Sequence, residues 1–253
     1  MKKLAFFDSG LGGLTVLHEA LKQMPHEQYL YFADSDHAPY GIQSTAAIKT
    51  LVFDAVDFLI QQDLKALVVA CNTATSVVIK ELRKQYSIPI IGMEPAVKPA
   101  MELVSNKKTL LCATQKTLEE NKLQLLIENL NATGKVERLS LQNLVYFAEK
   151  FDFKSAEVQA YLSHSFSKIN WVAFDSIVLG CTHFVYFKSL IKQLIPTHIH
   201  ILDGNKGTIK HLKNTIPLNT NKQTFPIEFF SSKKAMPQSH FAPCFALLNQ
   251  QNL

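Results

Sequence analysis

The sequence predicts an α/β protein with two similar parallel-sheet domains that are related by a pseudo-twofold axis and enclose one site in the cleft between them. Two matching stretches carry this prediction. Residues 67–70 are apolar and end at Cys71-Asn72-Thr73, and the apolar residues 177–180 end at Cys181-Thr182-His183, 110 residues later. Because no polar residue alternates with the apolar ones, each run is typical of a strand buried on both faces. Ligands bind at the carboxyl ends of such strands, so we expect a site bounded by two cysteines.

The bulk composition narrows the functional class. The chain has 253 residues, of which 47% are hydrophobic and 19% charged, and it is long enough to bury a sizeable core. Its net charge of +5 comes without the dense Lys/Arg cluster of a nucleic-acid surface. The apolar residues 4–7 are too few for a signal peptide, and no stretch reaches the roughly eighteen apolar residues of a membrane span. We therefore expect a cytoplasmic protein without a nucleic-acid or membrane partner.

The first half of the chain alternates strands and helices. The expected strands are residues 4–7, 29–33, 67–70 and 88–92, and the expected helices start at residue 14 or span 44–62 and 74–85. This βαβαβ order predicts a parallel sheet with right-handed crossovers. The glycine-rich turn at residues 8–13 lacks both the G-x-G-x-x-G spacing and a Walker lysine, so nucleotide binding is unsupported. Simple chain reversal explains this turn as well as ligand binding does.

The second half repeats the pattern of the first. Strands are expected at residues 110–112, 136–139, 176–179 and 198–202, and helices at 117–129, 155–169 and 184–194. Both halves contain the order strand, Cys loop, helix, Ile-Pro, strand and Gly, which indicates an internal duplication. The tail contains one expected strand, residues 224–230, and we predict no regular element after Ser231.

The two cysteines at equivalent positions permit several chemistries. Structural zinc needs about four ligands with local pair spacing, and only Cys181 and His183 are close in sequence. The four cysteines form no C-x-x-C pair, so we expect free thiols in a reducing compartment. A Cys/His nucleophile leaves Cys71 without a role, and packing of both thiols in the core remains a structural alternative. Two opposed thiols fit best with racemisation, in which one thiolate removes a proton from a carbon and the other thiol returns one to the opposite face.

Five motifs in the same order resemble bacterial glutamate racemases of the aspartate/glutamate racemase superfamily. They are Phe7-Asp8-Ser9-Gly10-Leu11-Gly12-Gly13, Pro39-Tyr40-Gly41, Ala70-Cys71-Asn72-Thr73-Ala74, Glu94-Pro95 and Gly180-Cys181-Thr182-His183-Phe184. The resemblance implies cofactor-independent interconversion of L- and D-glutamate, without a metal ion, that supplies D-glutamate for peptidoglycan synthesis. It also implies that the active site lies between the two α/β domains.

The resemblance also assigns roles to individual residues. Cys71 and Cys181 match the two acid/base thiols, Asp8 and His183 match the groups that assist them, and Glu149 is a candidate for a third assisting acid. The positions that match substrate contacts are Asp8, Ser9, Tyr40, Gly41, Asn72, Thr73, Thr114, Thr182 and His183.

The same family pattern predicts the domain boundaries and leaves alternatives open. The first domain would comprise residues 1–96 plus 208–253, and the second residues 97–207. A homodimer is a candidate assembly. The chain departs from the pattern at Ala113, where a glycine is usual, and before Glu149, where a proline and a cysteine are absent. An aspartate racemase, a decarboxylase of the same superfamily, and a binding or regulatory protein that kept the pocket are the alternative functions.

Overall fold

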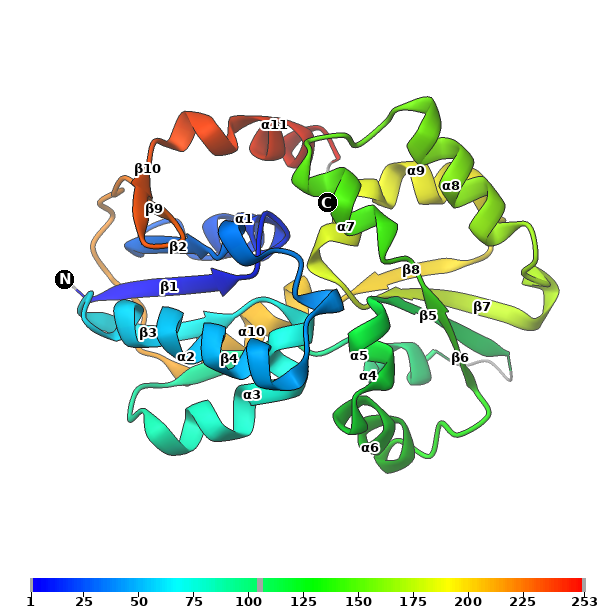
Figure 1. Ribbon diagram of the computed structural model, residues 1–253, viewed down its shortest axis with the longest axis horizontal. Helices are drawn as coiled ribbons and strands as arrows, with labels where there is room; N and C mark the ends of the chain where they lie inside the picture. Colours follow the sequence, from blue (N-terminus) through cyan, green and yellow to red (C-terminus); the bar gives the residue numbers. More distant parts are fainter. Residues whose placement is uncertain (1, 104–106, 252–253) are drawn as a thin grey trace.

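The structure is a computed structural model that describes residues 2–103 and 107–251, and it contains two parallel-sheet lobes side by side (Figure 1). The sheet of the first lobe has the order β10-β9-β2-β1-β3-β4. Its strands are β1 (Lys3–Asp8), β2 (Tyr29–Ala33), β3 (Leu64–Val69), β4 (Ile90–Gly92), β9 (Glu228–Ser231) and β10 (Lys234–Met236). All neighbouring strands are parallel except β10, which runs antiparallel to β9.

The sheet of the second lobe has the order β6-β5-β7-β8 and is entirely parallel. Its strands are β5 (Lys108–Ala113), β6 (Val136–Ser140), β7 (Phe174–Leu179) and β8 (His200–Asp203). The four strands β5, β6, β7 and β8 pair with one another as β1, β2, β3 and β4 do. In both lobes the register shifts by one residue near the start of the central strand, at Lys3/Leu4 and at Lys108/Thr109. This shared irregularity supports the predicted duplication.

Helices cover both sheets. The α-helices are α1 (Leu14–Gln23), α2 (Thr45–Ile60), α3 (Asn72–Gln85), α4 (Val97–Met101), α5 (Gln115–Glu119), α6 (Asn121–Asn129), α7 (Asn143–Glu149), α8 (Ala156–Phe166), α9 (Lys188–Leu194), α10 (Asn205–Thr215) and α11 (Ala242–Gln250). Ser44 is the N-cap of α2, since its hydroxyl accepts a hydrogen bond from the Ala47 amide at 3.1 Å. The central strands β1, β3, β5 and β7 are buried on both faces, as the unbroken apolar runs predict.

The tail returns to the first lobe and then reaches across to the second. Strand β9 pairs with β2, and α11 contacts both α1 and the 3₁₀ segment η4 (Thr182–Phe187), above the junction of the lobes in Figure 1. The predicted domain boundary after residue 207 falls inside α10. Because α10 packs against α1 and β4, we propose that the boundary lies at Gly204 and that the whole helix belongs to the first domain.

Several expected elements differ in the structure. The helix expected at residues 117–129 is two helices, because Glu120 adopts an extended backbone between α5 and α6. The helix expected at 184–194 begins as η4, and only Lys188–Leu194 is α-helical. Strand β10 and helix α11 follow Ser231, where no element was predicted. Pro243 lies in the first turn of α11, where its missing N–H costs nothing.

Candidate active site

Cys71 lies at the point where β3 ends and α3 begins. Its sulfur accepts a hydrogen bond from the Ala74 amide at 3.4 Å and lies 3.6 Å from Ser9 Oγ. The thiol is buried, and burial together with the nearby negative charge of Asp8 raises the pKa of Cys71 to about 12, although the bonds from Ala74 and Ser9 act in the other direction. In the closed pocket Cys71 is therefore a neutral thiol at pH 7.

Cys181 has a different set of neighbours at the end of β7. His183 Nδ1 lies 3.7 Å from Cys181 Sγ, and His183 Nε2 lies 2.5 Å from Glu149 Oε1. Burial alone would lower the pKa of His183, but the contacts with Cys181 and Glu149 outweigh it and raise this pKa well above its usual value. A protonated imidazole thus lies between the sulfur and the carboxylate.

Asp8 is buried behind Thr182, at the end of β1. Its carboxylate accepts hydrogen bonds from the Gly10 amide at 2.9 Å and from Thr182 Oγ1 at 3.1 Å. Burial raises the pKa of Asp8 to about 6, and the positive charge of His183 limits the rise. The carboxyl group therefore changes protonation state close to neutral pH.

The glycine-rich turn after Asp8 contacts the second lobe directly. The Leu11 amide donates a hydrogen bond of 2.7 Å to Glu149 Oε1 in the second lobe. The Gly12 amide nitrogen lies 3.2 Å from His183 Nε2; because a protonated Nε2 carries no lone pair, this is a close contact when the imidazole is charged. A Cβ atom on Gly12 would lie 2.4 Å from His183 Nδ1. The turn therefore does more than reverse the chain, because its backbone also contacts Glu149 and His183 of the second lobe.

Three threonine hydroxyls meet between the lobes near the start of α3. Thr73 Oγ1 lies 3.0 Å from Thr114 Oγ1 and 3.1 Å from Thr117 Oγ1, and Thr114 donates to Thr117 at 2.9 Å. The sequence interpretation included Thr73 and Thr114 but not Thr117. The Thr-x-x-Thr spacing after β5 was the available signal, because Thr114 is the N-cap of α5 and places Thr117 beside it.

The Tyr40-Gly41 turn is held in place by a buried carboxylate. Tyr40 OH donates to Asp34 Oδ2 at 2.6 Å, and Asp34 Oδ1 also contacts His37 Nδ1 at 2.9 Å and Ser232 Oγ at 3.1 Å. Burial, followed by the charge of Asp34, raises the pKa of Tyr40 far above its usual value, so the phenol stays neutral. Ser232 comes from the β9–β10 hairpin, so the tail supports this side of the site.

One small cavity brings most of the predicted residues together. Its lining consists of Ser9, Pro39, Tyr40, Gly41, Cys71, Asn72, Thr73, Thr114, Val145, Cys181, Thr182 and His183. Val145 was not predicted from the sequence, and Pro39 was named there only as part of the Pro39-Tyr40-Gly41 motif. Asp8 and Glu149 are absent from the lining and lie behind it, where they contact Thr182 and His183. The cavity measures about 10 Å³, which is barely the space of one water molecule.

Two further properties of the described residues bear on function. All four cysteines are free and buried. Within residues 2–103 and 107–251, no cluster of three or more His, Cys, Asp or Glu side chains has the arrangement of a metal site. In the same part of the chain, no helix combines the length and the apolar character that a membrane crossing requires.

Comparison with known proteins identifies the family. The model of the Asp/Glu/Hydantoin racemase family matches residues 9–212. The glutamate racemase of Halothermothrix orenii is 48% identical over 85% of this chain and 85% of its own length, and that of Campylobacter concisus is 49% identical over 91% and 89%.

Solved structures support the same assignment. Escherichia coli glutamate racemase, in complex with L-glutamate and the activator UDP-MurNAc-Ala, superposes with a TM-score of 0.82 at 27% identity, covering 98% of this chain and 96% of that one. Francisella tularensis glutamate racemase, in complex with D-glutamate, gives a TM-score of 0.80 at 26% identity, with 98% and 94% covered. The predicted fold class and the resemblance are thereby confirmed, and the chain belongs to the Asp/Glu/Hydantoin racemase family.

Proposed function

We propose that this protein interconverts L- and D-glutamate by a two-base mechanism in which Cys71 and Cys181 exchange protons with the α-carbon. The observation that carries the proposal is that both sulfurs line one cavity although they come from different sheets. Each follows the carboxyl end of its strand, β3 or β7. A substrate in this cavity meets one thiol from each lobe, as proton transfer on opposite faces of a carbon requires.

The chemical step balances without an external reagent. One sulfur, as thiolate, removes the α-proton and becomes a thiol, which leaves a planar carbanion that is conjugated with the α-carboxylate. The opposite thiol then donates its proton to the other face and becomes a thiolate. The net change is inversion at the carbon, and the two sulfurs have exchanged protonation states. The reverse reaction starts from that exchanged state, so both enantiomers are substrates.

The polar lining supplies the electrostatic part of the mechanism. A proton on the α-carbon is very weakly acidic, so the developing negative charge needs preorganised hydrogen-bond donors. Ser9, Asn72, Thr73 and Thr182 line the cavity and offer hydroxyl or amide donors to the substrate carboxylates. In our proposal Asp8 and Glu149 act through Thr182 and His183, which makes them positioning residues.

Substrate binding needs separation of the lobes. The cavity of about 10 Å³ cannot hold glutamate, and its walls are joined by direct contacts between the lobes, among them the Thr73–Thr114 and Asp8–Thr182 bonds. We propose that the lobes open to admit the substrate and that its polar groups then replace part of these contacts. The hydroxyls of the closed cavity are thus the groups that bind the substrate.

The remaining parts of the proposal concern the cellular context. The reaction as proposed uses no organic cofactor and no metal ion. Supply of D-glutamate for peptidoglycan synthesis is the role that the product suits. The cytoplasmic location and the homodimer stay predictions.

Isotope exchange tests the proposal directly. The protein is incubated with L-glutamate in deuterated water, with a thiol reductant and without cofactor. We expect optical rotation to decay to zero while deuterium enters the α-carbon, because the proton returned comes from solvent-exchanged thiols. Absence of both changes would refute the proposal. A parallel incubation with L-aspartate separates the alternatives, since faster racemisation of aspartate would identify an aspartate racemase and loss of carbon dioxide a decarboxylase.

A further inference from the structure

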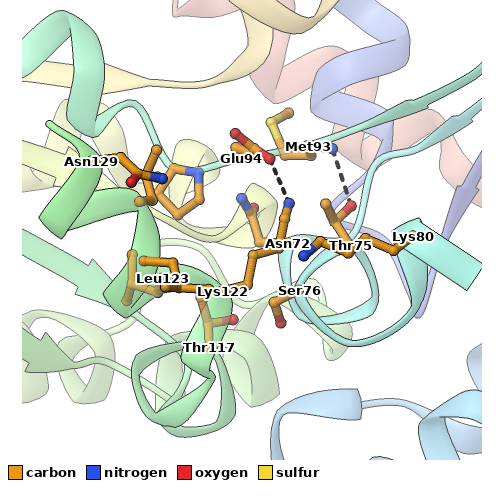
Figure 2. A pocket seen from close by; sticks show the side chains of 13 residues that line it. Asn72, Thr75, Ser76, Lys80, Met93, Glu94, Thr117, Lys122, Leu123 and Asn129 are labelled. Atoms are coloured by element: carbon orange, nitrogen blue, oxygen red, sulfur yellow. Dashed lines mark hydrogen bonds and ion pairs between the residues drawn. The ribbon is translucent and has the colours of Figure 1, made fainter.

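A second cavity lies beside the catalytic one, in the cleft between α3 and the β4–α4 connection on one side and α5 and α6 on the other. It measures about 300 Å³ and is lined by Asn72, Thr75, Ser76, Lys80, Met93, Glu94, Pro95, Thr117, Lys122, Leu123, Leu125, Leu126 and Asn129 (Figure 2). We call it the cleft pocket. Its size is within the range of cavities that bind small organic molecules, whereas the catalytic cavity is closed.

The lining of the cleft pocket divides into a polar part and an apolar part. Figure 2 shows Glu94 and Lys122 joined across the pocket, with Nζ 2.5 Å from Oε1. Lys80, on α3, is exposed and forms no ion pair with any residue that the structure describes. Two ammonium groups thus face one carboxylate. The apolar part comes from leucines of α6, the helix that also carries Lys122, and it includes Leu125, which is 50% exposed. An anion with an apolar body matches this division.

Asn72 is the residue that joins the cleft pocket to the catalytic cavity. It lines both and is only 6% exposed, yet its side-chain amide makes no hydrogen bond within residues 2–103 and 107–251. In Figure 2 the Asn72 side chain lies near the Glu94–Lys122 pair. This amide is therefore a free donor for a ligand in either cavity.

We propose that the cleft pocket binds a small carboxylate with an aromatic or branched aliphatic body, and that this ligand inhibits turnover by holding the lobes closed. The carboxylate would bind Lys122 and the Asn72 amide, and the apolar body would pack on Leu123, Leu125 and Leu126. A molecule that contacts both lobes stabilises the arrangement in which the catalytic cavity is too small for substrate. The same amide is then unavailable to glutamate.

The sign of the effect follows from linkage. If the ligand prefers the closed arrangement and the substrate needs the open one, each weakens the binding of the other by the same factor. The ligand should therefore raise the apparent KM for glutamate and leave kcat unchanged. This kinetic consequence rests on the proposed function, whereas binding to the cleft pocket does not.

The test uses 2-naphthoate as the probe and isothermal calorimetry on the full-length chain. We expect one site per chain. The neutral analogue 2-naphthalenemethanol, and the variant Lys122→Gln with naphthoate, should each bind about tenfold more weakly, since a hydrogen-bonded charge is lost. Leu125→Asn should weaken binding several-fold by removing apolar contact. Lys108→Gln is the matched control: Lys108 pairs with Glu137 on the surface of the second lobe, outside the pocket, so binding should not change.

Each outcome is decisive. Absence of saturable binding at about 10 mM probe, or equal binding by the wild type, Lys122→Gln and Leu125→Asn proteins, would overturn the proposal, the second because the probe would then bind elsewhere. Binding that leaves the KM for glutamate unchanged would refute the coupling. Calorimetry with Cys71→Ser, which lacks one acid/base thiol, should still show the site, so failure of the racemase mechanism and failure of the cleft pocket give different results.

Discussion

The two thiols occupy equivalent points of a duplicated framework, but their surroundings are not duplicated. Cys71 is the N-cap of the long helix α3 and lies near Ser9 and the carboxylate of Asp8. Cys181 is followed by a 3₁₀ segment and contacts His183, which in turn contacts Glu149. The negative charge of Asp8 near Cys71 favours the neutral thiol, whereas the charge beside Cys181 is the positive charge of His183.

This difference places charges of opposite sign beside the two sulfurs. A two-base racemase needs one thiolate and one thiol at the same time, and two identical environments would give both groups the same preference. The duplication therefore supplies the symmetry of position that inversion requires, and the unmatched side chains supply the asymmetry of charge. The following predictions test or refine that comparison, from the largest expected effect to the smallest.

Removal of either sulfur should abolish racemisation. We expect Cys71→Ser and Cys181→Ser each to lower kcat by at least about 10³, because each deletes one of the two proton-transfer groups. The measurement is circular dichroism of glutamate over time. Each variant should retain α-proton exchange with one enantiomer only, and the two variants should prefer opposite enantiomers. Full racemisation by either one would contradict the two-base scheme.

Removal of the imidazole should affect the second-lobe thiol alone. His183→Asn is expected to lower kcat about 10²-fold, because Cys181 loses the cation beside it. Alkylation by iodoacetamide reports the thiolate directly. In a Cys71→Ser background His183→Asn should slow alkylation of Cys181, and in a Cys181→Ser background it should leave the alkylation rate of Cys71 unchanged. Equal effects on both sulfurs would show that the environments are not separate.

Asp8→Asn should remove a pH dependence of stability. The pKa of Asp8 is raised from 3.8 to about 6 in the folded chain, so between about pH 4 and 6 the native state binds more protons than the unfolded one. The free energy of unfolding should therefore fall as pH rises through this window, by on the order of 2–3 kcal/mol from this group. Urea unfolding at pH 4 and pH 7 measures it. The free energy of unfolding should fall between pH 4 and pH 7 by more in the wild type than in Asp8→Asn. Parallel pH profiles of the two proteins would show that the buried carboxyl does not titrate in this range.

The smallest expected effect concerns the hydrogen bond between Tyr40 and Asp34, which anchors the first-lobe side of the site. Asp34→Asn should raise the KM for glutamate about tenfold with little change in kcat, because Tyr40 loses a charged hydrogen-bond acceptor and the Tyr40-Gly41 turn loses its anchor. Ser232→Ala is the matched control, since it removes one bond to Asp34 but leaves the bond from Tyr40, and it should change KM less. An equal fall in kcat for both variants would indicate general destabilisation.

Local patterns predicted the framework well. The unbroken apolar runs before Cys71 and Cys181 predicted β3 and β7, and their repetition predicted the two sheets. The motif residues Ser9, Asn72 and Thr182 were identified in the sequence, and the structure places them around one cavity. These features follow from strand burial and chain order, which short stretches of sequence record.

Contacts between the lobes could not be predicted in the same way. The hydrogen bond that Glu149 accepts from the Leu11 amide joins residues that are far apart in the chain, and no local spacing encodes it. The position of Asp8 behind Thr182 depends on how the sheets face each other. Helix α10 begins with Gly204 and polar residues, which resemble a loop, and it is held by packing on α1. Tertiary packing decides such elements more than local propensity does.

The glycines at the lobe junction have a consequence for how the protein tolerates mutation. A methyl group on Gly10 would lie 2.0 Å from Glu149 Oε1, one on Gly12 2.3 Å from Thr182 Oγ1, and one on Gly41 2.3 Å from Gln142 Oε1. In each case the side chain belongs to the other lobe. At Gly10 and Gly41 the neighbouring atom is the end of a flexible side chain that can turn away, but at Gly12 the neighbours are the buried Thr182 hydroxyl and His183 ring. An alanine at Gly12 would therefore act as a wedge that holds the lobes apart while each lobe keeps its own core.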